Sequence, residues 1–250
     1  MRSLRMTIAY DGTEFAGWQR QPGQRTVQGE IERVLAYITG EKISVVASGR
    51  TDAGVHALGQ VVGFQTNSAL PASTLLKAIN AELPHDICVF DVSPAPDDFD
   101  PIRDCVRKRY RYVIEDSRPP DLFMRPYYWR VYNRLDIDAM IESAAPLVGK
   151  HDFISFETGG SSRLTTTRTI HELLIERRPD QRTERVIIEI EADGFLYNMV
   201  RNIVGTLVLV GRGKRPVSWP GEVLAAKDRR AAGMTAPARG LFLMWVKYEI

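Results

Sequence analysis

The stretch from Ser48 to Gln60 constrains the fold more than any other part of this chain. Its sequence is S-G-R-T-D-A-G-V-H-A-L-G-Q, with glycine at positions 49, 54 and 59. So many glycines suit neither a packed helix interior nor a central strand. Apolar, β-branched runs precede it at 43–47 and follow it at 60–65, which predicts two strands joined by a glycine-rich loop. Loops held by a rigid sheet commonly carry binding and catalytic side chains.

Two loops therefore become candidate binding segments, and each allows two interpretations. In the first, Arg50 and Asp52 form either a weak surface ion pair or part of a functional site. The second loop, at 14–23, mixes aromatic, amide and basic side chains and includes Trp18 and Gln19. That mixture suits a flat polar ligand such as a nucleobase or ribose, or else a packed structural turn.

The apolar periodicity predicts an α+β fold. In the first half it indicates helices after Thr26 and Pro71, and strands at 4–10, 43–47, 60–65 and 87–92. This is the β-α-β-β-α-β order of a split βαβ unit. The proline- and acid-rich stretch 93–98 is the predicted linker.

The second half repeats this order loosely. It has predicted strands at 108–114, 169–177, 185–192 and 241–248, and predicted helices at 137–147, 197–210 and after Pro220. A short apolar patch at 151–156 precedes a loop at 158–167 that contains Arg163. The helix at 197–210 has one apolar face, and Asn198, Arg201 and Asn202 are predicted to lie off it.

Together these patterns predict two split-βαβ (ferredoxin-like) halves, residues 1–104 and 105–250. We expect them to form a mixed, mainly antiparallel sheet with helices on one side and a central active-site cleft.

The composition is that of an ordinary globular protein, with local clusters of positive charge. A chain of 250 residues with 44% hydrophobic and 26% charged residues is typical of a soluble globular protein of one or two domains. Its net charge of +2 does not by itself indicate nucleic-acid binding. Basic clusters at 103–111 and 212–215 do suggest a local site for an anionic ligand.

Cysteine and histidine usage argues against disulfides and metals. The two cysteines, Cys88 and Cys105, are far apart and suit a reducing compartment. The four histidines show no metal-ligand spacing with them. We also find no signal peptide and no apolar run near the roughly 18 residues of a membrane span, so we expect a cytoplasmic protein without a membrane partner.

Five motifs then occur in order along the chain. They are F-x-G-W-Q at 15–19, G-R-T-D-A-G-V-H at 49–56, R-Y-R-Y at 109–112, M-V-R-N-I-V-G at 199–205 and T-A-x-x-x-G-L at 235–241. In these motifs the chain resembles the tRNA pseudouridine synthase A family, whose members isomerise uridine in the anticodon arm of tRNA. The second motif is the most specific, and the resemblance covers nearly the whole chain.

The resemblance implies a role for individual residues. Asp52 matches the catalytic aspartate, Tyr110 the active-site tyrosine, and Arg201 the arginine that pairs with the aspartate, so the site is expected between the two halves. The implied substrate-binding residues are Arg50, His56, Tyr110, Trp18, Gln19, Arg109 and Arg111. For His56, an RNA contact and a bond to the loop backbone are both open.

Two stretches depart from the family pattern. Family members often carry a His-Ala-Arg-Phe-like segment before the R-Y motif, where this chain has D-P-I-R at 100–103. Members can also have histidines before M-V-R-N, where this chain has Tyr197 and Asn198. The ligand contacts of the 100–103 stretch are therefore open.

The implied reaction agrees with the residues present. Uridine becomes pseudouridine when the bond from C1′ to N1 breaks, the base turns, C1′ joins C5 and the C5 proton leaves. No redox step occurs, so we expect no cofactor and no metal, and we find no motif for either. Asp52 either attacks covalently or removes a sugar proton. An arginine such as Arg201 favours its anion, while Tyr110 offers a flat face to the base and a hydroxyl for the C5 proton.

The substrate would be a tRNA, modified at positions 38, 39 and 40 of its anticodon stem-loop. A stacked uridine must be flipped out, and phosphate contacts can offset that cost. The candidates for those contacts, or else solvated charges, are Arg103, Lys108, Arg109, Arg111, Arg163 and Arg168. The family works as homodimers with the tRNA across both subunits, which would explain a basic groove on a chain of net charge +2.

Two rival functions remain. A non-catalytic RNA-binding protein of the same plan would need exposed strand aromatics in the RNP pattern, which we do not find. A metal-independent hydrolase using Asp52 would need a second acid for the leaving group, and none is evident.

Overall fold

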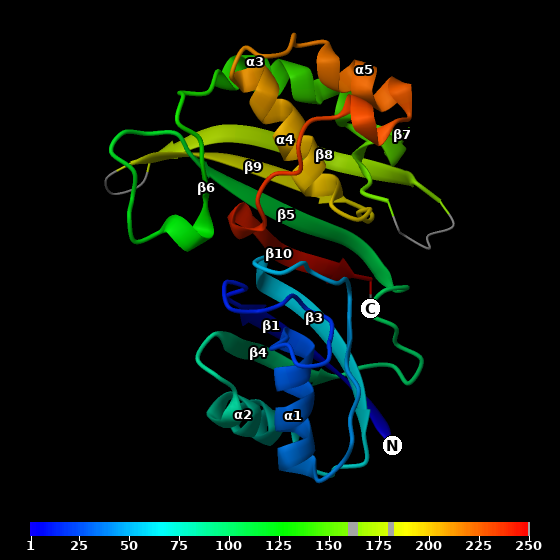
Figure 1. Ribbon diagram of the computed structural model, residues 1–250. Helices are drawn as coiled ribbons and strands as arrows, with labels where there is room; N and C mark the ends of the chain where they lie inside the picture. Colours follow the sequence, from blue (N-terminus) through cyan, green and yellow to red (C-terminus); the bar gives the residue numbers. More distant parts are fainter. Residues whose placement is uncertain (160–164, 180–182, 250) are drawn as a thin grey trace. The chain divides into compact units, whose positions relative to one another are not determined.

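The computed structural model describes residues 1–159, 165–179 and 183–249. By its internal contacts the chain divides into two compact units (Figure 1). Unit 1 comprises Met1–Val106 with Phe242–Ile250, and unit 2 comprises Arg107–Leu241. The division into halves 1–104 and 105–250 stays a prediction; by contacts, the residues from Phe242 onward group with the N-terminal residues.

Unit 1 has the predicted β-α-β-β-α-β order. Its elements are β1 (Arg2–Tyr10), α1 (Val27–Thr39), β2 (Val46–Ala47), β3 (His56–Thr66), α2 (Ala72–Glu82) and β4 (Ile87–Pro94). The strands lie in the order β4-β1-β3-β10, where β10 is Leu241–Tyr248. β1 is antiparallel to both β3 and β4, β10 is parallel to β3, and β2 pairs with β3.

Helix α1 shows why the local sequence folds as predicted. The side chain of Thr26 caps it by accepting a hydrogen bond from the backbone N–H of Gly29 at 3.2 Å. Gly40 ends it with φ 71°, a left-handed conformation that favours glycine. Between these two ends the apolar side chains at 27, 31, 34 and 35 are buried, and α1 packs beside α2, which covers β4.

The glycine-rich stretch is not a loop over its whole length, and this corrects our prediction. Strand β3 begins at His56 rather than near Gln60, and β2 is only two residues long. Gly59 therefore lies inside a strand. A Cβ at Gly59 would lie 2.6 Å from the carbonyl oxygen of Met244 on β10. Here glycine permits a close approach of backbone rather than a turn.

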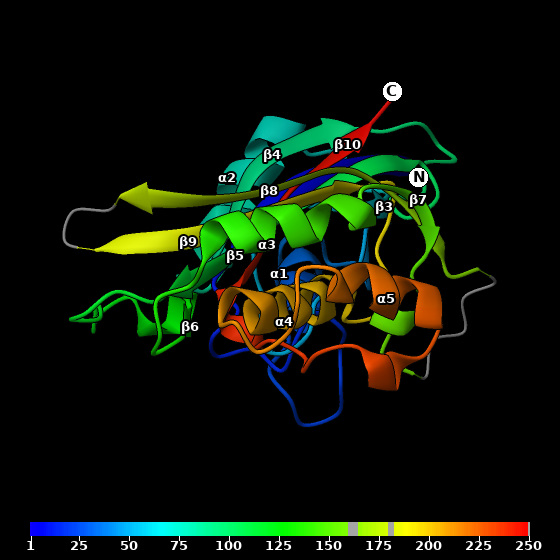
Figure 2. The same ribbon diagram turned by 90° about the horizontal axis from the view of Figure 1, so that it is seen from above.

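Unit 2 is a second sheet covered by helices. Its strands are β5 (Cys105–Glu115, entering the unit at Arg107), β6 (Trp129–Arg130), β7 (Gly149–Asp152), β8 (Thr167–Pro179) and β9 (Glu184–Ala192). They lie in the order β5-β9-β8-β7, all antiparallel, with β6 parallel to β5. The helices α3 (Ile137–Ala144), α4 (Met199–Gly211) and α5 (Trp219–Ala226) pack together on one side of this sheet (Figures 1 and 2).

The predicted α+β class and the mixed, mainly antiparallel strand pairing are confirmed, while the central cleft stays a prediction. The patch at 151–156 forms the end of β7 and a 3-10 turn at Ile154–Phe156. Part of the predicted 158–167 loop, including Arg163, lies outside the described residues. Over the described ranges, no helix combines the length and apolar character needed to cross a membrane.

Candidate active site

The two candidate loops of unit 1 pack directly against each other. The backbone N–H of Trp18 donates to the carbonyl oxygen of Thr51 at 2.9 Å. Gly17, with φ +98°, makes this approach possible, because a Cβ there would lie 2.9 Å from the carbonyl oxygen of Thr51 and 3.1 Å from the backbone nitrogen of Ala53. The F-x-G-W-Q motif therefore supports the backbone on both sides of Asp52.

Asp52 occupies a tight turn and is half-buried. Its carbonyl oxygen accepts a hydrogen bond from the N–H of Val55 at 3.1 Å, and Gly54 completes the turn with φ +77°. Gly12 packs against the far end of the turn, since a Cβ there would lie 2.0 Å from the carbonyl oxygen of Val55. The turn that carries the predicted catalytic carboxylate is thus fixed by backbone contacts.

His56 bonds the loop backbone, which was one of the two interpretations of this residue. Its Nδ1 accepts a hydrogen bond from the N–H of Gly12 at 3.0 Å. The ring is 2% exposed and stacks on Phe242 with ring centroids 4.6 Å apart. This arrangement ties the start of β3 to the loop after β1.

The other predicted binding residues of unit 1 differ in exposure. Trp18 is only 3% exposed and packs near Tyr10, with ring centroids 6.2 Å apart. Its ring therefore lies in the core of the loop, as the packed-turn interpretation expects. Gln19 and Arg50 are exposed, so their side chains are accessible to a ligand.

In unit 2, Tyr110 lies on β5 and is 9% exposed. Its ring makes an edge-to-face contact with Phe195, with centroids 5.0 Å apart and planes at 87°. This geometry is a favourable aromatic pairing that fixes the plane of the tyrosine ring.

Arg109 and Arg111, predicted to bind RNA, are ion-paired with glutamates of β9, and Arg109 also with one on β8. Arg109 contacts Glu189 at 2.9 Å and Glu191 at 2.6 Å, and it also bonds Glu172. Arg111 contacts Glu189 at 2.6 Å. Glu189 and Glu191 alternate with apolar residues on β9, and this period-two pattern was the signal that our sequence analysis missed. Much of the positive charge of the R-Y-R-Y motif is therefore neutralised within the unit.

Arg201, in the first turn of α4, brings the last two motifs together. Its Nε donates to the carbonyl oxygen of Ala236 at 2.7 Å, and its Nη1 donates to Oδ1 of Asn198 at 2.8 Å. Its own carbonyl oxygen accepts from the N–H of Ala236 at 3.1 Å. Asn198 adopts φ 60°, a left-handed conformation that asparagine tolerates.

Asn202 is fully buried, although the apolar pattern predicts that it lies off the apolar face of the same helix. Its amide nitrogen donates to the carbonyl oxygen of Phe156 at 2.7 Å. Its Oδ1 accepts from the hydroxyl of Thr235 at 2.7 Å and from Nη2 of Arg229 at 2.9 Å. A buried amide is stable only when its polar atoms are bonded in this way, and neither partner segment was evident from the helix pattern.

Tyr112 anchors the final motif to β5. Its hydroxyl donates to the carbonyl oxygen of Pro237 at 2.7 Å. Gly240 lies against the same ring, since a Cβ there would lie 2.8 Å from it. The second tyrosine of R-Y-R-Y thus has a structural role that the sequence analysis did not assign.

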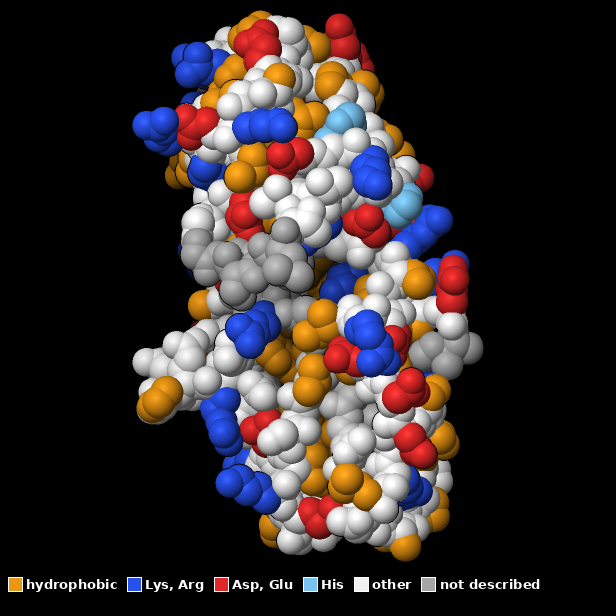
Figure 3. Space-filling model, turned by 90° about the vertical axis from the view of Figure 1, so that its right-hand side faces the viewer, with side chains coloured by type: hydrophobic (Ala, Val, Ile, Leu, Met, Phe, Trp, Pro, Cys, Tyr) orange, Lys and Arg blue, Asp and Glu red, His pale blue; other side chains and the backbone are white. Residues whose placement is uncertain are grey.

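The remaining predicted phosphate contacts have protein partners or lie outside the described residues. Arg103 pairs with Asp104 at 2.7 Å, and Arg168 donates to the carbonyl oxygen of Thr165 at 3.1 Å. Lys108 is half-buried on β5. On the face shown in Figure 3, Lys and Arg side chains form separate small groups, several of them beside Asp or Glu. Among the described residues, no group of three or more His, Cys, Asp or Glu side chains is arranged to hold a metal ion.

Comparisons with known proteins agree with the motifs. A family model described as tRNA pseudouridine synthase matches residues 6–102 and 144–249, so Tyr110 falls between its two matched ranges. The tRNA pseudouridine synthase A of Halalkalibacterium halodurans is 46% identical over 242 residues, covering 96% of this chain and 90% of the relative. The proteins of the same name from Brevibacillus brevis and Thermoanaerobacter sp. (strain X514) are 46% and 43% identical over 248 residues, 99% of this chain and 100% of each relative.

Proposed function

Because this chain belongs to the tRNA pseudouridine synthase family and is therefore an isomerase, we propose that it converts uridine to pseudouridine at positions 38, 39 and 40 of the tRNA anticodon stem-loop. The observation that carries this proposal is the fixed turn at Asp52. Backbone contacts from Gly12 and Trp18 hold the turn while its aspartate side chain is only half-buried. An essential group needs such preorganisation to act on a flipped nucleotide.

In the proposed mechanism Asp52 supplies the carboxylate for cleavage of the bond from C1′ to N1, either as nucleophile or as base. Arg201 stabilises its anion through directional hydrogen bonds. Tyr110 stacks on the base, and its hydroxyl assists removal of the C5 proton after C1′ has joined C5. Since Asp52 lies in unit 1 and the other two lie in unit 2, the mechanism requires both units.

Substrate binding is proposed to involve Arg50 and Gln19, which are exposed. His56 and Trp18 would support the site through the loop contacts described above rather than by direct stacking. We propose that the enzyme works in the cytoplasm as a homodimer on tRNA, without a cofactor or metal.

The test is Asp52→Asn, assayed by tritium release from C5-labelled uridine in tRNA. We expect release to be abolished while tRNA still binds, because the substitution removes the ionised carboxylate and keeps the shape. Asp97→Asn, at an exposed aspartate, is the matched control and should behave as the unaltered enzyme. Release that survives in Asp52→Asn would refute the role of this residue. Sequencing of chemically marked pseudouridine in the treated tRNA would test the three positions.

A further inference from the structure

The segment 117–134, between β5 and α3, carries exposed apolar side chains that have no role in the proposed active site. We call it the Phe123 loop. It lies in the part of the chain that falls between the two ranges of the family match. Phe123 is 89% exposed, and Leu122, Met124 and Tyr132 are also exposed. Exposed apolar side chains gathered on one loop are a common mark of an interaction surface.

Hydrogen bonds shape the tip of this loop. Oδ1 of Asp121 accepts from the backbone N–H groups of Phe123 at 3.0 Å and Met124 at 3.3 Å. Its Oδ2 contacts Nη2 of Arg185 at 3.0 Å, and its carbonyl oxygen accepts from the hydroxyl of Tyr128 at 2.5 Å. These hydrogen bonds therefore fix the backbone that presents the exposed side chain of Phe123.

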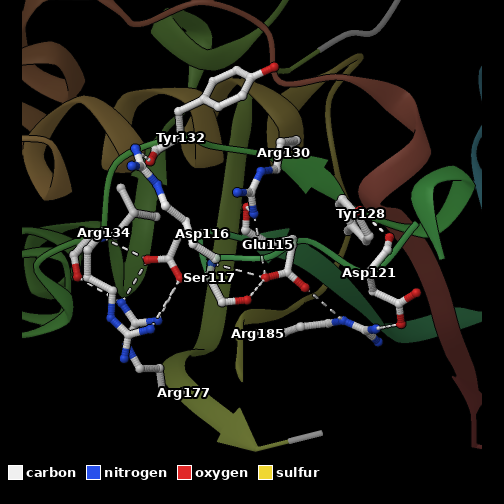
Figure 4. Close-up of polar contacts among 12 residues, drawn as sticks. Glu115, Asp116, Ser117, Asp121, Tyr128, Arg130, Tyr132, Arg134, Arg177 and Arg185 are labelled. Atoms are coloured by element: carbon white, nitrogen blue, oxygen red, sulfur yellow. Dashed lines mark hydrogen bonds and ion pairs between the residues drawn. The ribbon is translucent and has the colours of Figure 1, made fainter. Parts of the chain in front are cut away.

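The base of the loop is anchored by a cluster of charges (Figure 4). The side chains of Glu115 and Asp116 are fully buried. Asp116 bonds both terminal nitrogens of Arg177, at 2.7 and 2.8 Å. Glu115 lies 3.6 Å from Arg185 and 3.7 Å from Arg130. These three arginines are thus occupied inside the protein.

Two further arginines of the loop are exposed and bond backbone rather than buried carboxylates. Arg118 and Arg125 are exposed, and each donates to a backbone carbonyl oxygen, that of Tyr132 at 3.0 Å and that of Leu122 at 2.7 Å. Within the part of the chain that the structure describes, neither forms an ion pair. Arg125 therefore places positive charge beside the exposed ring of Phe123, and Arg118 adds positive charge near the base of the loop, where it bonds Tyr132.

We propose that the Phe123 loop is a further tRNA-binding surface, with Phe123 stacking on an unpaired base and Arg118 and Arg125 contacting phosphates. Aromatic rings with neighbouring arginines are the usual means of binding single-stranded nucleic acid. A second copy of this chain is the less suitable occupant, because a symmetric contact at this loop would bring the same arginines together. The inference rests on the proposed function, since it takes tRNA as the substrate.

The experiment compares Phe123→Ala with Phe90→Ala, which removes another exposed phenylalanine, on β4. Binding of labelled tRNA is measured by fluorescence anisotropy, and kcat and KM by tritium release. We expect Phe123→Ala to weaken tRNA binding about fivefold or more, raising KM with kcat retained. Phe90→Ala should change neither value.

A second pair of variants tests the charges. The double variant Arg118→Ala/Arg125→Ala should lower the dependence of affinity on salt, by a log–log slope of about 0.7 to 0.9 per lost phosphate contact. Arg33→Ala, at an exposed arginine paired with Glu30, should leave the slope unchanged.

Unchanged affinity and slope in the loop variants would overturn the inference. So would a Phe123→Ala protein whose only change is a lower mass by sedimentation, since that result assigns the loop to a second copy. Failure of the proposed function is separate, because it would appear as activity that persists in Asp52→Asn.

Discussion

Gly205 on α4 lies so close to Met234 that a Cβ on this glycine would be 1.7 Å from the methionine carbonyl oxygen. The residue before Met234 is also bonded to α4, because the N–H of Gly233 donates to the hydroxyl of Thr206 at 3.0 Å. This contact lets Ala236 reach Arg201. The position of the proposed anion-stabilising arginine therefore depends on a missing side chain one helical turn away.

We predict that Gly205→Ala destabilises the protein although alanine favours a helix over glycine by about 1 kcal/mol. The added methyl group would force the 233–236 segment away from α4 and break the bonds between Arg201 and Ala236. We expect a net loss of about 1–3 kcal/mol in the free energy of unfolding, measured by urea denaturation, together with a large loss of tritium release.

Gly221→Ala, on α5, is the matched control for this change. A Cβ there would lie 3.5 Å from Pro146, an ordinary contact. This variant should be at least as stable as the unaltered protein. If Gly205→Ala behaved like Gly221→Ala in both assays, the close contact would have no structural importance.

A second prediction concerns Tyr10, whose hydroxyl lies 2.8 Å from the hydroxyl of Thr51, the residue before Asp52. Burial raises the pKa of Tyr10 to about 12, although the side chains of Thr51 and Gln60 lower it, so the phenol is neutral at physiological pH. Tyr10→Phe should cost only about 1 kcal/mol of stability. It should lower kcat by roughly 10- to 100-fold, because the turn carrying Asp52 loses a support.

The control for this variant is Tyr37→Phe, since Tyr37 is 73% exposed. It should match the unaltered enzyme in kcat and in urea denaturation. A Tyr10→Phe enzyme with normal kcat would show that the hydrogen bond to Thr51 does not position the turn.

The strand and helix order could be predicted because it depends on local periodicity. The cap at Thr26 and the apolar face of α1 are properties of a few neighbouring residues, and the structure agrees with both. The extent of the glycine-rich loop could not be predicted in the same way. Gly59 is explained by the approach of β10, which lies far away in sequence.

The candidate site shows the same division between local and distant causes. The motifs identified the family and implied the site residues, and the structure explains how Gly17 and Gly205 bring pairs of motifs together. The partners of Arg109 and Asn202 depend on which strands and loops become neighbours. A single sequence gives no direct information about those contacts, so the full burial of Asn202, outside the apolar face of its helix, could not be predicted.

The last prediction is a loss of stability in acid, for which Asp116 is the clearest cause. Burial alone would raise the pKa of this carboxyl, but hydrogen bonds from Arg177 and the N–H of Leu135 hold it below its ordinary value. A carboxyl with a lowered pKa in the folded state stabilises that state fully above its unfolded pKa of about 3.9. That stabilisation is lost as the pH falls from there through the lower, folded pKa.

Urea denaturation between pH 7 and pH 3 measures this effect. The unaltered protein should lose stability mainly below about pH 4. Asp116→Asn should already be weaker at pH 7, by about 3 kcal/mol or more, because it leaves Arg177 without its partner. It should also lose less than the unaltered protein on acidification, whereas Asp97→Asn should follow the unaltered curve. Parallel acid curves for Asp116→Asn and the unaltered protein would assign the acid sensitivity to other carboxylates. Glu189 and Glu191 are the candidates, because their pKa values are also lowered. Burial opposes this lowering, but hydrogen bonds from Arg109, together with Arg111 for Glu189 and Arg107 for Glu191, outweigh it.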